Sequence, residues 1–180
     1  RQYTLHYDGA SYFYDKYGKA LSAAQVKPGE IVDLTFFKSK KRLNTLQRSK
    51  SSFFHEKISN YRIDEEKHQI SVGSGIYAYT DDMVILSDGK PAELIEINPI
   101  DRVTVYGIDS EIYSLVVEKG HGYVRLKNEE YFYGGFIEIG NEVVQRVTEN
   151  MLLVVPEGIH QVVISNKGTS GVKDIDVRRN

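Results

Sequence analysis

Short runs of alternating apolar and polar residues, separated by Gly, Pro, Asn and Asp, recur along most of the chain. The clearest run of the first half is Glu30–Phe37, which places Val32, Leu34 and Phe36 on one face. After a short basic turn Leu43–Leu46 returns, so we expect these two segments to pair as a hairpin. Further runs with a strand pattern are Tyr61–Ile63, Gln69–Val72, Ile76–Tyr79, Met83–Leu86, Glu93–Ile97, Arg102–Tyr106 and Glu111–Val117. Short strands with regular turn signals predict an antiparallel sandwich or barrel.

Three N-terminal stretches are less regular. Gln2–Tyr7 ends at an Asp-Gly pair, and we expect it to form an opening hairpin with Ser11–Tyr14. Lys19–Gln25 is rich in Ala and Leu, which predicts one or two helical turns. Ser51–Asn60 fits both a helix face and a strand, and we expect a short helix there.

Two apolar runs organise the C-terminal third of the chain, Met151–Val155 and Ile159–Ser165. A Val-Pro-Glu-Gly segment joins them and predicts a hairpin turn. Both faces of the second run carry apolar residues, so we expect this strand, Ile159 included, to be buried on both faces. A sandwich core supplies such an environment.

The two halves are expected to meet at Glu118–Gly122, where two glycines permit a sharp turn. The predicted domains are residues 1–117, a β-rich domain, and residues 118–180, a small β domain. No Pro-, Ser- or Gly-rich linker separates them, and no internal repeat is apparent. The predicted fold class is all-β: a short-stranded antiparallel sandwich or barrel followed by a small β-sandwich.

The second of these domains resembles the PEGA domain, a small all-β repeat of bacterial and archaeal envelope proteins. The resemblance rests on Gly122–Leu126, Gly134–Ile139 and Val155–Ile164, with a further glycine soon after. The family has no catalytic residues to carry over. What the resemblance implies is an extracytoplasmic location and an accessory or binding role.

Composition adds few constraints. The 180 residues include 23 basic and 25 acidic residues, so the net charge of −2 creates no field that would select nucleic acid or an anionic membrane. The absence of cysteine excludes disulfides, thiol nucleophiles and cysteine metal sites. No apolar run is long enough to span a bilayer. Because the sequence starts at Arg1 rather than Met, we expect that a segment able to hold a signal peptide or membrane anchor has been removed.

The sequence contains no pattern typical of an enzyme or of a cofactor site. Its five histidines lack the spacing of a zinc site, and there is no Gly-x-Ser-x-Gly elbow and no phosphate-binding loop. We therefore predict a protein that is not an enzyme and that holds no metal and no cofactor.

One candidate binding segment is basic. Between Lys38 and Lys50 no acid occurs, and phenylalanines flank the segment on both sides. Positive charge beside aromatic rings suits a phosphate backbone, an anionic wall polymer or lipid headgroups. We expect a solvated hairpin first, with polyanion binding and then nucleic-acid binding as alternatives. The candidate residues are Lys38, Lys40, Lys41, Arg42, Arg48 and Lys50.

A second candidate is a ligand loop made of His121, Tyr131 and Tyr133. Flanking glycines expose the His121 ring or let the backbone approach a ligand; the alternative is a turn histidine that bonds a nearby carbonyl. The tyrosines lie in the polar, glycine-rich stretch Asn128–Gly135. Such rings suit a sugar or a peptide, or they cover the core as part of a turn.

The predicted function is a non-enzymatic, extracytoplasmic envelope module with a binding or spacer role. Its expected partners are a wall polysaccharide, a polyanion or another envelope protein, with membrane contact only through a removed anchor. The alternative is a nucleic-acid-binding barrel that uses the basic segment.

Overall fold

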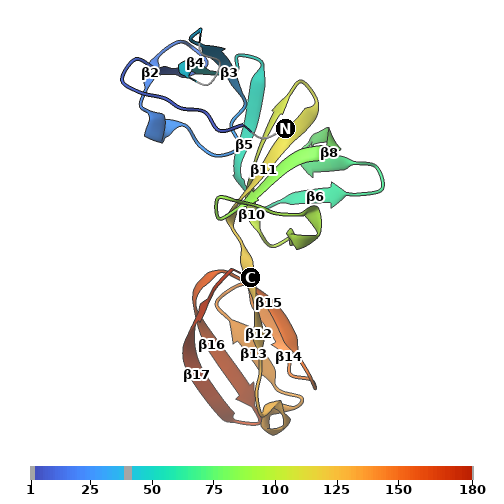
Figure 1. Cartoon of the computed structure of the whole chain (residues 1–180). Coiled ribbons are helices and arrows are strands. Elements are labelled where there is room, and N and C mark those ends of the chain that lie inside the picture. Colours follow the sequence, from blue (N-terminus) through green and yellow to red (C-terminus); the bar gives the residue numbers. More distant parts are fainter. Residues whose placement is uncertain (1–2, 39–41, 180) are drawn as a thin grey trace. The chain divides into compact units, whose positions relative to one another are not determined.

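The computed structural model describes residues 3–38 and 42–179 and is all-β, as the sequence predicts (Figure 1). Within this range the only helical elements are short 3₁₀ turns, and no helix is long or apolar enough to cross a membrane. The chain forms two compact units: Arg1–Leu94 with Val103–Val117, and Ile95–Arg102 with Glu118–Asn180. Residues 95–102, which precede the predicted junction in sequence, therefore belong to the second unit.

The first unit begins with a four-stranded sheet in the order β2-β1-β4-β3. Its elements are β1 (Tyr12–Tyr14), β2 (Ala20–Leu21), η1 (Ala23–Gln25), β3 (Val32–Phe36) and β4 (Leu43–Arg48). The predicted β3–β4 hairpin is confirmed, since Leu34 lies opposite Leu46 in an antiparallel ladder.

The predicted opening hairpin is wrong, because β1 pairs antiparallel with β2 and parallel with β4. Of the described residues 3–7 of the first segment, only His6 joins the sheet, through an isolated bridge to Arg42. The physical reason lies in the turn after β1. The Asp15 carboxylate accepts hydrogen bonds from the backbone N–H groups of Tyr17 and Lys19, which brings β2 back onto β1.

A larger sheet of the first unit has the order β5-β10-β11-β8-β7-β6, and β9 adds to β8. The elements are β5 (Ser52–Ile58), β6 (Tyr61–Asp64), β7 (Gln69–Val72), β8 (Gly75–Ser87), β9 (Lys90–Pro91), η2 (Leu94–Glu96), β10 (Arg102–Ile108) and β11 (Glu111–Lys119). The pairs β5–β10, β6–β7, β7–β8 and β8–β9 are antiparallel, whereas β8 and β11 pair in parallel.

Two expectations for this sheet are corrected. Residues Ser52–Ile58 form strand β5 and not a helix, because pairing with β10 places Phe54 opposite Tyr106. The helical spacing of apolar residues in this segment does not decide its conformation, because pairing with β10 stabilises the strand. Residues 93–97 contain the 3₁₀ turn η2 instead of a strand. The predicted strands around Tyr77 and Val84 are one continuous strand, β8.

The structure also contains an internal repeat that the sequence analysis did not find. The series β1-β2-η1-β3-β4 recurs as β8-β9-η2-β10-β11: in each series the first strand pairs antiparallel with the second and parallel with the last. The turns η1 and η2 begin 71 positions apart (94 − 23), as do the prolines that follow them (99 − 28). The equivalent positions include Gly18 and Gly89, Pro28 and Pro99, Glu30 and Asp101, Val32 and Val103, and Leu34 and Val105. We call these series copy 1 and copy 2.

The second unit is a sandwich of a two-stranded sheet, β12-β15, and a four-stranded sheet, β14-β13-β16-β17. Its elements are β12 (His121–Arg125), η3 (Glu129–Phe132), β13 (Phe136–Ile139), β14 (Val143–Arg146), β15 (Leu152–Pro156), β16 (Gly158–Asn166) and β17 (Thr169–Val177). The core includes Ile137 and Ile139 of β13 and Leu153 and Val155 of β15.

The predicted hairpin between the two C-terminal apolar runs is wrong. Strand β15 pairs with β12, whereas β16 pairs with β13 and β17, so Pro156–Gly158 crosses from one sheet to the other. The His160 ring, which is hydrogen-bonded to the Pro156 carbonyl at 2.7 Å, fixes this crossing. Because only one face of β16 meets the other sheet, Ile159 is 82% exposed instead of buried.

Candidate functional site

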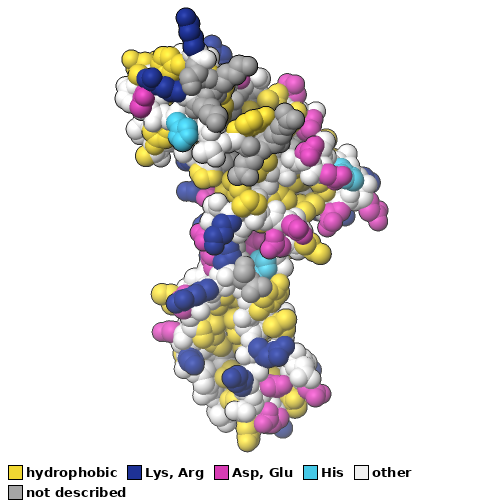
Figure 2. Space-filling model, in the orientation of Figure 1, with side chains coloured by type: hydrophobic (Ala, Val, Ile, Leu, Met, Phe, Trp, Pro, Cys, Tyr) yellow, Lys and Arg dark blue, Asp and Glu magenta, His cyan; other side chains and the backbone are white. Residues whose placement is uncertain are grey.

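The basic segment does not form one cationic surface in the described part of the chain. Lys40 and Lys41 lie outside the described residues. Lys38 and Lys50 are both exposed, but they follow the ends of antiparallel strands β3 and β4, so they lie at opposite ends of the hairpin. The Arg42 guanidinium pairs with Asp8 at 3.0 Å and lies over the Phe37 ring at 4.5 Å. The face of the molecule in Figure 2 likewise shows acidic and basic side chains interspersed.

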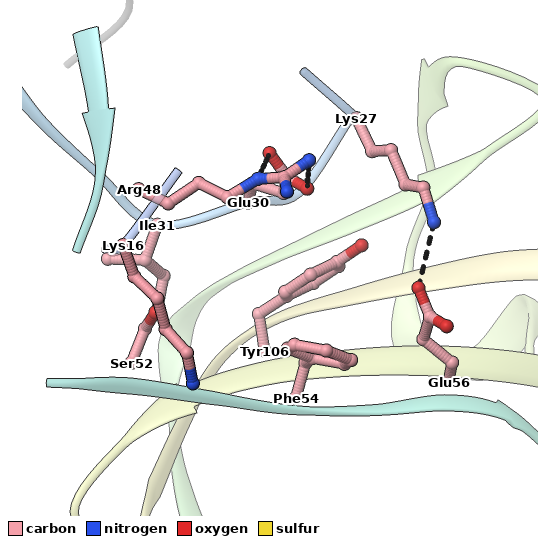
Figure 3. Close-up of a pocket in the computed structure, with 9 residues that line it drawn as sticks. All are labelled: Lys16, Lys27, Glu30, Ile31, Arg48, Ser52, Phe54, Glu56 and Tyr106. Atoms are coloured by element: carbon pink, nitrogen blue, oxygen red, sulfur yellow. Dashed lines mark hydrogen bonds and ion pairs between the residues drawn. The ribbon is translucent and has the colours of Figure 1, made fainter. Parts of the chain in front are cut away.

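Arg48 points into a small pocket of the first unit (Figure 3). Aromatic rings of Phe54 and Tyr106 form its floor, with ring centroids 6.2 Å apart. Arg48 binds Glu30 above this floor through two contacts of 2.8 and 3.0 Å. To one side Lys27 pairs with Glu56 at 2.8 Å.

Most charged side chains of this pocket are paired with a side chain of opposite charge. Lys27 lowers the pKa of Glu56 by a direct hydrogen bond, so this carboxylate stays ionised beside its partner. The Arg48 guanidinium also donates to the Gln25 carbonyl at 2.8 Å. Of the lining cations only Lys16 has no carboxylate partner among the described residues. We interpret the pocket as a polar seam that joins copy 1 to β5 and β10.

The three residues of the predicted ligand loop do not form one site. His121 begins β12 and is buried, with Nδ1 2.8 Å from the Asp101 carboxylate. Tyr131 and Tyr133 lie beyond the other end of β12, in and after η3. The pairing of β12 with β15 confirms that His121 is distant from the two tyrosines. His121 lies opposite Pro156 at one end of this pair, and Arg125 lies opposite Leu152 at the other. The side-chain partner of His121 is a carboxylate and not the carbonyl expected for a turn histidine.

An open groove of about 480 Å³ lies next to Tyr133. It is lined by Gly134, Gly135 and Phe136 on one side and by the β16–β17 turn, Ser165–Ser170, on the other. A side chain at position 135 would collide with the Ser165 carbonyl, so glycine lets the two backbones approach closely. The Asn166 side chain donates to the Tyr133 carbonyl at 3.3 Å and ties the loop to the turn.

Strand register gives the groove a regular floor. On one row across the four strands Arg146 lies opposite Phe136, Phe136 opposite Ser165, and Ser165 opposite Ser170. All four side chains are exposed, and Phe136 is exposed to 49%. A ring, a guanidinium and two hydroxyls therefore share one surface. We call this surface, together with Tyr133, the aromatic groove.

Tyr133 contributes a hydrogen-bond donor at the rim. Desolvation, and next the negative charges of Glu149 and Glu129, raise the pKa of Tyr133, so its hydroxyl keeps its proton at neutral pH. Glu129 itself is ionised, because hydrogen bonds from backbone N–H groups, including that of Asn150, lower its pKa. The negative charges thus lie near Tyr133, whereas the groove itself is lined, among the described residues, by Lys167 and by no acid. No group of acids and histidines in the described residues is arranged to hold a metal ion.

The chain matches no known family model, no curated protein and no solved structure. The sequence pattern indicates Tyr133 of the aromatic groove but not Phe136 or the β16–β17 turn. The Asn-Lys-Gly segment at 166–168 is a hairpin-turn signal that would have predicted that turn. Its position beside Phe136 depends on the β13–β16 pairing, which local sequence does not reveal.

Proposed function

We propose that the chain is a non-enzymatic module of the cell envelope, located outside the cytoplasmic membrane, which binds a neutral or amino-sugar polysaccharide at the aromatic groove. The observation that carries this proposal is the row of Arg146, Phe136, Ser165 and Ser170 beside Tyr133. Sugar rings pack their C–H faces on aromatic side chains, while hydroxyls and guanidinium groups bond their oxygens. The resemblance of the C-terminal third to the PEGA domain supports the envelope location.

The charge around the groove selects among polysaccharides. Carboxylates of Glu129 and Glu149 near Tyr133 would repel the part of a polyphosphate or uronate chain that lies at this ring, although Lys167 and Arg146 add positive charge to the same surface. A neutral glycan avoids this cost, and the ammonium group of an amino sugar gains from it. The alternative of nucleic-acid binding gains no support from Arg42 and Arg48, because both are paired with carboxylates.

Retention on polysaccharides tests the proposal. The 180-residue chain is incubated with peptidoglycan sacculi, chitin and cellulose, and bound protein is measured at low and at high salt. We expect retention on at least one of these glycans, with little dependence on salt because no ion pair dominates. Phe136→Ala and Tyr133→Ala should each weaken binding by about 1 to 2 kcal/mol, or about five- to thirtyfold in affinity.

Tyr123→Ala is the matched control. Tyr123 is 48% exposed, close to the 44% of Tyr133, but it lies on β12, in the other sheet of the same unit. Equal losses for Tyr123→Ala and Phe136→Ala, or absence of retention on all three glycans, would contradict the proposal. Protease accessibility of the protein on intact cells of its natural source tests the location separately.

A further inference from the structure

Strand β3 forms the edge of the first sheet and pairs only with β4 in the described part of the chain. Its backbone orientation follows from two hydrogen bonds. The Ile31 carbonyl accepts from Ser49 N at 2.9 Å, and Phe37 N donates to the Arg42 carbonyl at 3.1 Å, so both residues face β4. Because backbone groups alternate along a strand, those of the apolar residues between them, Val32, Leu34 and Phe36, point away from the sheet.

Copy 2 shows what covers the equivalent edge. Strand β10 occupies the place of β3, and its Val103 and Val105 correspond to Val32 and Leu34 at a separation of 71 positions (103 − 32, 105 − 34). In copy 2 these residues pair antiparallel with Ile58 and His55 of β5. On this outer edge the same strand of the repeat thus has an antiparallel neighbour in copy 2 and, among the described residues, none in copy 1.

The β3 sequence is complementary to itself in antiparallel orientation. If two β3 strands pair around Leu34, then Leu34 faces Leu34, Val32 faces Phe36, and Asp33 faces Thr35. Apolar side chains then extend the face on which Leu34 lies beside Leu46. On the other face the Thr35 hydroxyl donates to the Asp33 carboxylate, and no like charges oppose each other. The outward N–H and C=O groups of facing residues would exchange hydrogen bonds.

We propose that β3 is the interaction surface for a second copy of this chain, with the two first sheets joined around Leu34 into one continuous sheet. The irregularity in the β3–β4 ladder supports this geometry, because the skipped residue, Asn44, belongs to β4 and leaves β3 regular. An open, regular edge strand without lysine or proline is also a known site of strand addition. The surface is separate from the aromatic groove, so either proposal can fail without the other.

Charge changes at Thr35 test the register. Thr35 is exposed, and its hydroxyl bonds the Thr45 hydroxyl at 2.5 Å and accepts from the Asn44 side-chain amide at 3.3 Å. Thr35→Asp and Thr35→Lys both remove this hydroxyl and its two contacts. In the dimer each new side chain faces Asp33. Thr35→Asp should therefore weaken association about three- to tenfold and Thr35→Lys strengthen it about as much. Association is measured by sedimentation equilibrium of the 180-residue chain from about 1 µM to about 1 mM.

Two further measurements complete the test. The chain has no cysteine, so Leu34→Cys introduces a single thiol that should form a disulfide-linked dimer on oxidation, because facing residues lie about 5.5 Å apart. In the unmodified chain the amides of Val32 and Leu34 should exchange with solvent more slowly at high than at low concentration. A chain that stays monomeric at 1 mM even as Thr35→Lys, or two Thr35 variants that shift association in the same direction, would overturn the proposal.

Discussion

Removal of the Asp101 carboxylate should destabilise the second unit more than any surface change in the chain. Asp101 is 1% exposed, and each of its oxygens has a partner: Oδ1 lies 2.8 Å from His121 Nδ1, and Oδ2 accepts from Asn98 N at 2.8 Å. The carboxylate can only accept, which assigns the Nδ1 proton to His121. Asp101→Ala removes this acceptor from both donors.

The expected loss is about 3 to 5 kcal/mol, the usual effect of breaking a buried pair. Two hydrogen bonds to a charged group, at about 1.5 to 3 kcal/mol each, lead to a similar figure. Since a small domain is stable by about 5 to 15 kcal/mol, the variant should be close to unfolding at room temperature. Asp101→Asn preserves the shape and one acceptor, so we expect a loss of about 1 to 2 kcal/mol.

The internal repeat supplies the control. Glu30 occupies the position of Asp101 in copy 1 and pairs with Arg48, but the side chain of Arg48 is 29% exposed, against 11% for His121. In Glu30→Ala, water can therefore hydrate the Arg48 guanidinium and compensate part of the lost ion pair. We expect the free energy of unfolding to fall by about 1 to 2 kcal/mol.

Each unit needs its own probe, because the two need not unfold together. Urea-dependent hydrogen exchange of the Val155 and Ile137 amides reports on the second unit, and that of Leu46 on the first. A loss below about 1 kcal/mol for Asp101→Ala, or equal losses for Asp101→Ala and Glu30→Ala, would refute the reasoning from burial.

Two further predictions concern an ion pair and a pair of glycines. The Arg179 guanidinium, bonded to Glu157, lowers the pKa of Glu157, so the stabilisation by this pair is complete above the unfolded value near 4.5 and is lost as the pH falls through the folded value. Arg179→Ala should cost about 1 kcal/mol in urea unfolding at pH 7, and this cost should shrink as the pH falls through the folded pKa of Glu157, whereas a cost that stays constant down to low pH would contradict this. Gly29 and Gly18 have similar positive φ angles, 85° and 87°, but a Cβ at Gly29 would collide with Val116 whereas Gly18 has open space around it. Gly29→Ala should therefore lower the free energy of unfolding by about 3 kcal/mol and Gly18→Ala by about 1 kcal/mol. Similar losses for both variants would show that only the backbone strain at positive φ matters, and not the contact with Val116.

Local pattern predicted most strands of this fold, because alternation and turn residues act over a few positions. It predicted β3, β4, β6, β7, β10 and β11 within a few residues. Pairing between strands was predicted less well. The β15–β16 turn fits a hairpin locally, yet the register of β12 with β15 decides that the two strands lie in different sheets. Neighbours distant in sequence carry that information.

For the candidate site, too, local sequence predicted single residues but not the pairing that brings them together. Tyr133 was identified from its glycine-rich surroundings, whereas Phe136, Ser165 and Ser170 become one surface only when β13, β16 and β17 are side by side. At Ser51–Asn60 a local pattern was present but misleading. The apolar residues have helical spacing, yet pairing with β10 makes the segment a strand. The repeat was missed because its two copies share few identical residues and are related mainly by spacing.

The unequal burial of the two copies supports a role for the β3 edge. Only Leu43 of the apolar residues in the copy 1 strands is fully buried, and Val32 and Leu34 are partly exposed. Copy 2 has β5 on its edge and β7 beside β8, and its buried apolar residues are Tyr79, Ile85, Val103, Val105, Tyr106, Ile112, Leu115 and Val117. Since both copies have the same topology, the difference comes from the neighbours that each sheet has. Copy 1 therefore gains more than copy 2 from any added strand, and the side chains of β3 fit a second β3.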